Sequence, residues 1–425
     1  MSVAKKAYRH MVGKDPYEIP LEDYDMTQPE IYQNMTFPGF FARIRNEDPV
    51  HYCKDSKYGP YWSITKFKDI MDVEGKPDLF SSEPTIALFE FKDTKTRPKF
   101  TAFIGMDEPE HSRQRRTVQD VVAPKNLANM EPIIRDRVCV ILDNLPIGET
   151  FDWVDRVSTE LTSQTLATLF DFPLENCRKL TYWSDVMTCV PGPDSMVSST
   201  DEVIRIMLTE TAPTFMQMWN DKKQQPPQYD LISMLVHGET TKNMATEKPF
   251  EFLGTLMLLI VGGNDTTRNS ISGSVVFMNE NPNEYQKLRD NHELVPSMVS
   301  ETIRYQTPLI HMRRTVTEDI EYKGKQMKKG DKVVLWYASG NRDSEEISNP
   351  DHYIIDREKP RHHISFGFGI HRCMGNRLAE MQLRIVWEEI LKRFQKIEVV
   401  GEVKRPYSNF VKGYTELPVR IHPLS

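Results

Sequence analysis

Phe366-Gly-Phe-Gly-Ile-His-Arg-Cys-Met-Gly375 is the stretch that decides the fold of this chain. Its three glycines allow backbone N–H groups to come close to a neighbouring atom. Downstream, apolar residues recur at intervals of three and four, which predicts an amphipathic helix that begins just after Cys373; they are Leu383, Val386, Trp387, Ile390, Leu391 and Phe394. Because the N-terminus of a helix stabilises negative charge, this loop suits a cysteine thiolate that binds a metal.

The other four cysteines give no such signal. They are Cys53, Cys139, Cys177 and Cys189. They lie far apart, with no CxxC pair and no CxxCH site, so we interpret them as small buried side chains of a reduced protein.

The cysteine loop resembles the signature of the cytochrome P450 superfamily, carried by the pattern Phe366-x-x-Gly369-x-His371-x-Cys373-x-Gly375. The resemblance implies haem b, bound non-covalently, with Cys373 as the iron ligand and Phe366, Gly369 and Gly375 around it. It also implies a mainly α fold with a smaller β lobe (α+β), shaped as a triangular prism, with the haem buried between a central helix and the cysteine-bearing helix.

Composition limits the class of protein. The chain has 425 residues, 39% of them hydrophobic, and a net charge of −7 from charges spread along its length. We therefore expect a folded protein without a nucleic-acid partner. The stretch Met1 to Lys14 has no apolar run, so we expect no signal peptide and no membrane anchor, and a cytoplasmic location.

We find no repeat and no long linker, which favours one domain over residues 1–425. Strand-like runs lie at Val50 to Cys53, Tyr61 to Thr65 and Lys332 to Tyr337. A β-rich part is expected at roughly 45–70, 310–340 and 395–425, with helices elsewhere. One helix, apolar on nearly every side, begins near Pro249 and should cross the centre of the protein until Gly262-Gly263 interrupts it.

Glu301 and Arg304 are three residues apart on one predicted helix face. Alone, such a pair is commonly an exposed ion pair of small value. The order of this pair, then Arg342, then Asp356-Arg357, then the cysteine loop resembles the P450 core. By that resemblance Glu301, Arg304 and Arg342 form a structural Glu-Arg-Arg network that supports the cysteine loop.

Basic residues are the candidates for binding the haem propionates. His111 and Arg115 are four residues apart on one helix face. The family resemblance adds Arg314, His363 and His371.

The segment Gly262-Gly-Asn-Asp-Thr-Thr267 resembles the oxygen-binding groove of the family. Gly262 and Gly263 would open the groove. Thr266 would hydrogen-bond dioxygen or a neighbouring water, and Asp265 would pass protons inward from solvent. The alternative is a purely structural role, in which the polar pair is hydrogen-bonded inside a buried helix. Together with Cys373, the acid and the alcohol favour a monooxygenase over a non-catalytic haem sensor.

A finer resemblance is to the bacterial alkane and fatty-acid terminal (omega) hydroxylases. It is carried by Leu259 to Asn269, His363 to Leu383 and Ser408 to Tyr414. Candidate substrate contacts, for each of which plain core packing is an equal alternative, are Val261, Leu309, Ile310, Phe410, Val411, Met187 and Val190. A terpenoid or steroid hydroxylase is the alternative function.

The segment Ala87 to Gly105 differs from the forms associated with short alkanes. Its bases could attract a fatty-acid carboxylate, although a solvated charge run is the default interpretation; the segment's apolar and basic residues are Phe89, Phe91, Lys92, Lys95, Arg97 and Lys99.

The chain carries no flavin or iron–sulfur pattern, so electrons would come from NAD(P)H through a separate ferredoxin reductase and ferredoxin. Basic residues near the cysteine could bind an acidic ferredoxin; they are Arg113, Arg116, Arg372 and Arg377. Chain length of the substrate, alkane against fatty acid, regiochemistry, oligomeric state and physiological role stay open.

Overall fold

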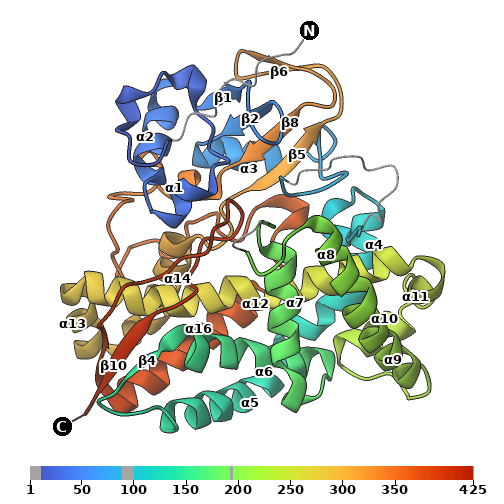
Figure 1. Ribbon diagram of the computed structural model, residues 1–425, viewed down its shortest axis with the longest axis vertical. Helices are drawn as coiled ribbons and strands as arrows, with labels where there is room; N and C mark the ends of the chain where they lie inside the picture. Colours follow the sequence, from blue (N-terminus) through green and yellow to red (C-terminus); the bar gives the residue numbers. More distant parts are fainter. Residues whose placement is uncertain (1–10, 89–99, 192–194, 425) are drawn as a thin grey trace.

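The computed structural model describes residues 11–88, 100–191 and 195–424. Helices make up most of this part, and the outline is broad at the helical end and narrower at the end that holds the largest sheet (Figure 1). This matches the predicted mainly α fold with a smaller β part.

The α-helices of the first half are α1 Pro29–Gln33, α2 Phe37–Glu47, α3 Phe67–Glu74, α4 Glu110–Val118, α5 Pro124–Asp143, α6 Glu160–Phe170, α7 Arg178–Thr188, α8 Thr200–Ile206 and α9 Ala212–Lys223. Those of the second half are α10 Leu231–His237, α11 Met244–Glu247, α12 Pro249–Glu280, α13 Pro282–Asp290, α14 Val295–Gln306, α15 Tyr337–Gly340 and α16 Asn376–Arg393.

Helix α12 crosses the middle of the molecule, as its apolar sequence predicted (Figure 1). Polar contacts fix it to its neighbours: Ser272 bonds with Ser158 before α6 at 2.8 Å, and Trp387 of α16 donates to Ser274 at 2.8 Å. The largest hydrophobic core surrounds it.

The predicted interruption at Gly262-Gly263 is wrong, because α12 is continuous from Pro249 to Glu280. Two glycines weaken a helix by about 1 kcal/mol each, but packing along both sides outweighs this. Gly263 has a packing reason instead: a Cβ there would lie 2.7 Å from Leu166 of α6.

Within the described residues, the strands form three separate sheets. The largest has the order β1-β2-β8-β5-β3, and the others are β4-β10-β9 and β6-β7. Their bounds are β1 Val50–Cys53, β2 Tyr61–Ile64, β3 Phe80–Ser81, β4 Thr150–Asp152, β5 Met312–Val316, β6 Ile320–Tyr322, β7 Lys325–Met327, β8 Lys332–Leu335, β9 Phe394–Val399 and β10 Pro418–Pro423. In the largest sheet β2 and β8 run parallel, with Trp62 paired to Val333, and β5 is antiparallel to β8, with Arg314 paired to Val333.

Two details of the predicted β-rich part need correction. The short strands β3 and β4 lie outside the three predicted ranges. The C-terminal strands β9 and β10 pair with β4, away from the largest sheet, because they pack on the helical part beside α12 (Figure 1). Asn279 of α12 accepts from the N–H of Val399 at 3.0 Å, which fixes β9 there.

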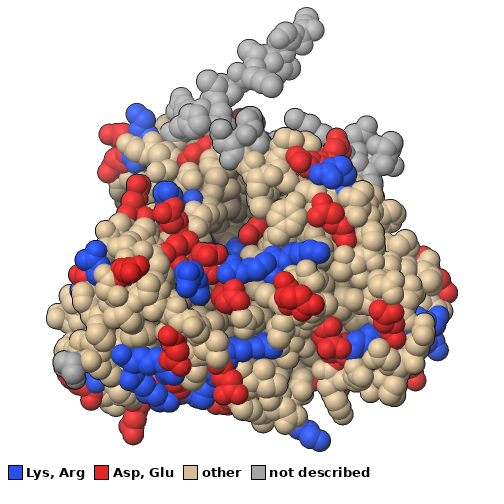
Figure 2. All heavy atoms as spheres, turned by 60° about the horizontal axis from the view of Figure 1, so that its bottom comes forward, with Lys and Arg blue, Asp and Glu red and all other residues tan. Residues whose placement is uncertain are grey.

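In the described residues, no helix has the length and apolar character that crossing a membrane requires. Basic and acidic side chains are interspersed on the face shown in Figure 2, in keeping with the small net charge of −7.

Candidate active site

The cysteine loop ends at the N-terminus of α16, as the sequence predicted. The N–H of Cys373 donates to the carbonyl of Phe366 at 2.8 Å, which closes the loop. Gly367 and Gly369 have φ values of 67° and 65°, a region that disfavours other residues. Gly369 also permits close contact with α3, since a Cβ there would lie 2.4 Å from the carbonyl oxygen of Glu74.

Cys373 lies deep among protein atoms, yet its side chain has free surface. It therefore faces a hollow within the protein. Burial raises the pKa of its thiol, while the N–H groups of Gly375 and Asn376 and the charges of Arg115 and Arg372 oppose that rise. These groups are what a thiolate ligand needs around it.

The other cysteines have a different character. Cys53 and Cys177 are buried, and Cys139 and Cys189 partly so. Burial raises the pKa of all four thiols, to about 12 for Cys53. At each of the four a nearby carboxylate adds to the rise, whereas the charges that act on Cys373 are those of arginines.

Four of the five predicted propionate-binding residues lie together around the cysteine loop and form what we call the cation group: His111, Arg115, Arg314 and His371. The rings of His111 and His371 are 4.1 Å apart. His111 Nε2 lies 3.1 Å from the carbonyl oxygen of Ile370, and Arg115 donates to the carbonyl of Arg372 at 2.6 Å. Burial, followed by the charges of Arg314, His111 and Arg115, lowers the pKa of His371 to about 2.

His363 makes none of these contacts, so its role at the propionates stays a prediction. It lies at the start of the cysteine loop, with its ring 5.5 Å from that of Phe366 and its Nδ1 accepting from the N–H of Ser365. Burial lowers its pKa to about 3, and the nearest charges come from Arg304, Arg372 and Arg361 rather than from Arg115 or Arg314.

Glu301 and Arg304 form a buried ion pair with two bonds of 2.7 Å. Arg304 also donates to the carbonyls of Asn341 and Pro350 at 2.8 Å, so it holds the segment that leads to the cysteine loop. The third member is Arg357, whose Nε donates to Glu301 at 2.9 Å.

Arg342 is not the third member of this network, contrary to the prediction. Its guanidinium pairs with Asp351 at 2.7 Å and lies over the ring of Tyr305 at 4.6 Å. The preceding residue, Asn341, is bonded to Arg304 through its carbonyl, and the carboxylate that the Arg342 side chain reaches is that of Asp351, not that of Glu301.

Asp265 and Thr266 lie in the middle of α12 with different surroundings. Asp265 is fully buried and accepts hydrogen bonds from Ser184 at 3.0 Å and Thr188 at 3.1 Å, both on α7, and from Asn264 at 2.9 Å. The Thr266 hydroxyl donates to the carbonyl of Gly262 at 2.9 Å and keeps free surface. Gly262 is exposed in mid-helix, and a Cβ there would meet nothing within 4 Å, so this turn borders open space.

Arg268, which the sequence interpretation missed, joins Asp265 to Asp185 of α7. It lies 3.1 Å from Asp265 and 2.6 Å from Asp185. Burial raises the pKa of Asp265 to about 6, although Arg268 opposes the rise. The spacing of three between Asp265 and Arg268 in one helix could have predicted this pair; the contribution of Asp185 could not be read from the sequence.

The predicted substrate contacts divide into two groups. Val261, Leu309, Phe410, Met187 and Val190 keep part of their surface free. Ile310 is fully buried in the core around Trp336, and Val411 is buried where it pairs with Leu309. Ile310 therefore cannot contact a substrate, since consecutive extended residues point to opposite sides and Leu309 takes the other side.

The basic residues predicted to attract a carboxylate, Lys92, Lys95, Arg97 and Lys99, lie outside the described residues together with Phe89 and Phe91. The predicted ferredoxin-binding arginines Arg113, Arg116, Arg372 and Arg377 are all exposed. Arg113 forms an ion pair with Glu110 at 2.6 Å.

The residues around the loop fit a haem group. Its two carboxylates need cations and hydrogen-bond donors. The structure supplies Arg115 and Arg314 as cations, and His371, neutral at its lowered pKa, has a buried Nδ1 without a partner among the described residues that can serve as a donor. Both ring nitrogens of His111 lie at hydrogen-bond distance from carbonyl oxygens, Nδ1 from that of Phe103 and Nε2 from that of Ile370, so the ring is fixed beside the cysteine loop.

Comparisons with known proteins agree with this site. The model of the family described as Cytochrome P450 matches residues 194–415. A solved cytochrome P450-153 from Novosphingobium aromaticivorans is 43% identical, covers 94% of this chain and 99% of its own, and has a TM-score of 0.87. Linalool 8-monooxygenase of Pseudomonas putida is 33% identical over 95% of this chain and all of its own length. A methyl-branched lipid omega-hydroxylase of Mycobacterium bovis is 28% identical over 96% of both chains.

The match extends over nearly the whole length of the chain and of these relatives, and it includes the cysteine loop. The fold, the haem cofactor and the class of activity all follow from this match. The chain belongs to the cytochrome P450 family, as a monooxygenase whose haem iron is held by a cysteine thiolate.

Proposed function

We propose that this protein hydroxylates the terminal carbon of a medium-chain alkane or fatty acid in the cytoplasm. In this proposal electrons come from NAD(P)H through a separate ferredoxin reductase and ferredoxin. The support is the resemblance of its motifs to terminal hydroxylases and its similarity to a relative named as an omega-hydroxylase.

Haem held by a thiolate at Cys373 supplies the oxygen chemistry of the reaction. The protein must add protons and position the substrate. Thr266 offers a hydroxyl at the open turn of α12, where it can hydrogen-bond oxygen or a water beside it.

Asp265, Arg268 and Asp185 connect this turn to solvent. The outer carboxylate, on Asp185, is 32% exposed, while the inner one, on Asp265, is fully buried. A carboxyl group with a pKa near 6 exchanges protons readily at neutral pH. Asp265 therefore receives protons at its outer side and passes them toward Thr266.

The observation that carries the substrate assignment is the apolar character of the predicted contact residues that keep free surface. Val261 lies one residue before the groove, and Leu309 and Phe410 come from two segments joined by a bond from the N–H of Ile310 to the carbonyl of Phe410 at 2.9 Å. A terminal C–H bond is stronger than its neighbours, so hydroxylation at the end of a chain depends on walls that position it.

A terpenoid or steroid hydroxylase is the second candidate, favoured by the 33% identity to linalool 8-monooxygenase. Titration of the ferric protein with dodecane, dodecanoic acid and linalool, followed by product analysis, separates the two. We expect the two linear compounds to shift the spin state and to yield 1-dodecanol and the omega-hydroxy acid. A shift with linalool alone would favour the terpenoid function.

Phe410→Ala tests whether this side chain helps to position the end of the substrate chain. The wider site should move oxidation from the terminal carbon to the neighbouring one, measured as the product ratio from dodecanoic acid. Ile310→Val is the matched control, because it removes a methyl group from the adjacent core without touching the wall. An unchanged product ratio in Phe410→Ala would remove Phe410 from the substrate site.

A further inference from the structure

Glu74, the last residue of α3, is a buried carboxylate next to the cysteine loop. Its side chain is only 2% exposed. Three donors surround it: Arg314 at 3.2 Å and the Tyr337 hydroxyl at 2.5 Å bond to one carboxylate oxygen, and the N–H of Phe368 bonds to the other at 2.8 Å.

These contacts favour the ionised form of Glu74. An ionised carboxylate only accepts hydrogen bonds, and neither a guanidinium nor a backbone N–H can accept one. Burial raises the pKa of Glu74, but Arg314, Tyr337 and Phe368 oppose the rise. Among the described residues, Glu74 is the one carboxylate that touches the cation group around the loop.

Glu74 joins parts of the chain that are far apart in sequence. Arg314 belongs to β5 and to the cation group, Tyr337 begins α15, and Phe368 belongs to the cysteine loop. One side chain therefore links a haem-carboxylate partner to the loop that carries the iron ligand.

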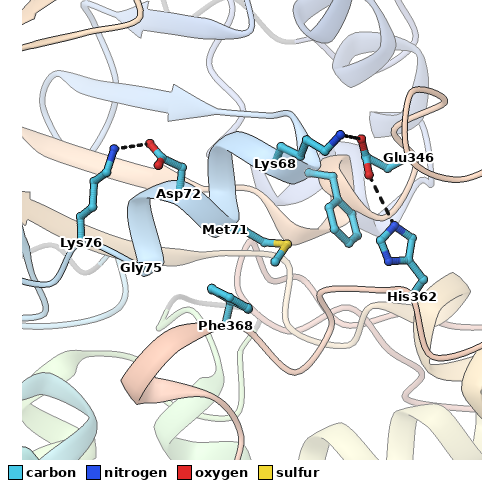
Figure 3. A pocket seen from close by; sticks show the side chains of 9 residues that line it. Lys68, Met71, Asp72, Gly75, Lys76, Glu346, His362 and Phe368 are labelled. Carbon is cyan, nitrogen blue, oxygen red and sulfur yellow. Dashed lines mark hydrogen bonds and ion pairs between the residues drawn. The ribbon is translucent and has the colours of Figure 1, made fainter.

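The loop is also held through the side chain of Phe368. Its ring lines a surface pocket of about 490 Å³ below α3, where it points toward Met71 and lies close to Gly75 (Figure 3). A Cβ on Gly75 would lie 3.9 Å from that ring. The backbone of Phe368 is thus bonded to the inner side of α3, while its ring packs against the outer side.

We propose that Glu74 is a positioning residue with two effects on the haem site. Its three bonds fix the cysteine loop and the direction of Arg314, which slows haem loss. Its negative charge, buried beside the site, favours the oxidised form of the iron and so lowers the reduction potential. Neither effect depends on which substrate the protein uses.

The test compares Glu74→Gln and Glu74→Asp with the wild-type holoenzyme. The first keeps the size and removes the charge; the second keeps the charge and shortens the reach. Asp72→Asn is the matched control, because Asp72 lies on the same helix and pairs with Lys76 at the surface (Figure 3). The readouts are the ferric–ferrous midpoint potential and the rate of haem transfer to apomyoglobin.

We expect haem transfer to be at least tenfold faster in both Glu74 variants, and the midpoint to move to a more positive value in Glu74→Gln but much less in Glu74→Asp. Asp72→Asn should match the wild type in both. Wild-type values in Glu74→Gln, or an equal midpoint shift in Asp72→Asn, would overturn the proposal.

Tyr337→Phe keeps the proposal testable if the Glu74 variants do not fold. It removes one donor from Glu74 and leaves the carboxylate in place. The expected result is a smaller change in the same direction for both readouts. Wild-type haem transfer and midpoint in Tyr337→Phe would contradict a role for this carboxylate.

Discussion

Asp265 and Thr266 are adjacent residues of α12 whose side chains have different surroundings. The sequence supplied an acid followed by an alcohol, and the structure adds that the acid faces α7 while the alcohol keeps free surface. The acid is therefore held in the interior by α7, while the alcohol remains accessible at the open turn of α12.

Thr266→Ala should uncouple NAD(P)H consumption from product formation, because the hydroxyl at the open turn is lost. We expect product per NAD(P)H to fall by at least about tenfold, measured with product analysis alongside nucleotide oxidation. Thr266→Ser should keep most of the coupling, and Thr267→Ala, at a buried neighbouring position, serves as a control. Unchanged coupling in Thr266→Ala would refute the role of the hydroxyl.

Asp265→Asn should change how stability depends on pH. Asp265 has a pKa of about 6 in the folded protein and an ordinary value of 3.8. Between these values the folded state binds more protons than the unfolded state, so the contribution of Asp265 to stability falls as pH rises from about 4 to about 6 and is constant above that.

The asparagine variant loses this dependence. Its melting temperature should therefore rise relative to that of the wild type as pH goes from 4 to 6, and the difference should stay level from 6 to 8. Thermal unfolding followed by circular dichroism at each pH measures this. A difference that is flat over the whole range would mean that Asp265 titrates at its ordinary value.

Single residues were predictable where the family motif fixes them to one short segment. Cys373 and His371 fall in the loop, and Arg115 follows His111 by one helical turn. Glu74 was not predictable, because the residue it holds, Phe368, is almost 300 positions later and a lone glutamate in a polar helix carries no signal.

At the scale of elements, the segment between α15 and the cysteine loop has almost no regular structure and depends on side chains for its shape. Glu301 and Arg304 supply them from α14, and Arg357 completes the set from within the segment. We predict that the cysteine loop depends on this network for its position, although the pair does no chemistry.

Glu301→Ala should abolish haem incorporation. It leaves Arg304 and Arg357 buried without their carboxylate, a loss on the order of 3–5 kcal/mol. The reduced carbon monoxide difference spectrum, with haem content per protein, measures the outcome. Arg342→Ala is the informative comparison: its partner Asp351 is largely exposed, so most holoenzyme should survive. Normal haem content in Glu301→Ala would show that the network is dispensable.

Elements were predicted well where local pattern decides and less well where packing does. The strands β1 and β2 begin at the predicted residues, and α16 follows Cys373. The break at Gly262-Gly263 was wrong because intrinsic propensity is small beside the contacts of α12 with its neighbours. The prediction of Arg342 as the third network member was wrong because the spacing of residues along an irregular segment does not say which way their side chains point.

At the scale of the whole molecule, electron transfer requires a second protein to find one face among several of mixed charge. Exposed arginines lie at the cysteine loop and at the start of α16, namely Arg372 and Arg377. Charges at the rim of an interface act mainly on the rate of association and on its dependence on salt.

Arg372→Glu with Arg377→Glu should therefore weaken the use of a ferredoxin by about tenfold at low salt, with a much smaller effect at high salt. The measurement is the apparent KM for ferredoxin across ionic strength. Arg420→Glu, on β10, is a control with the same kind of charge change on an exposed residue elsewhere. An equal rise in the apparent KM in the double variant and in the Arg420→Glu control would argue against a local docking site.

Global arrangement was the least predictable level. The sequence placed strands at both ends of the chain, but nothing local says that β2 pairs with β8 or that β10 pairs with β4. Such pairings arise from the burial of whole faces, and neither the residue pattern nor the family resemblance specified them.

The pairing of Trp62 with Val333 also determines when the largest sheet can form during translation. A ribosome adds roughly 5–20 residues per second, so the hairpin of β1 and β2 waits roughly 15–50 s for the strand that covers its edge. A two-stranded hairpin is at best marginally stable, and its open edge can pair with other chains during that wait. Cys373 follows β8 in the chain, so the iron ligand becomes available only after this sheet can be completed.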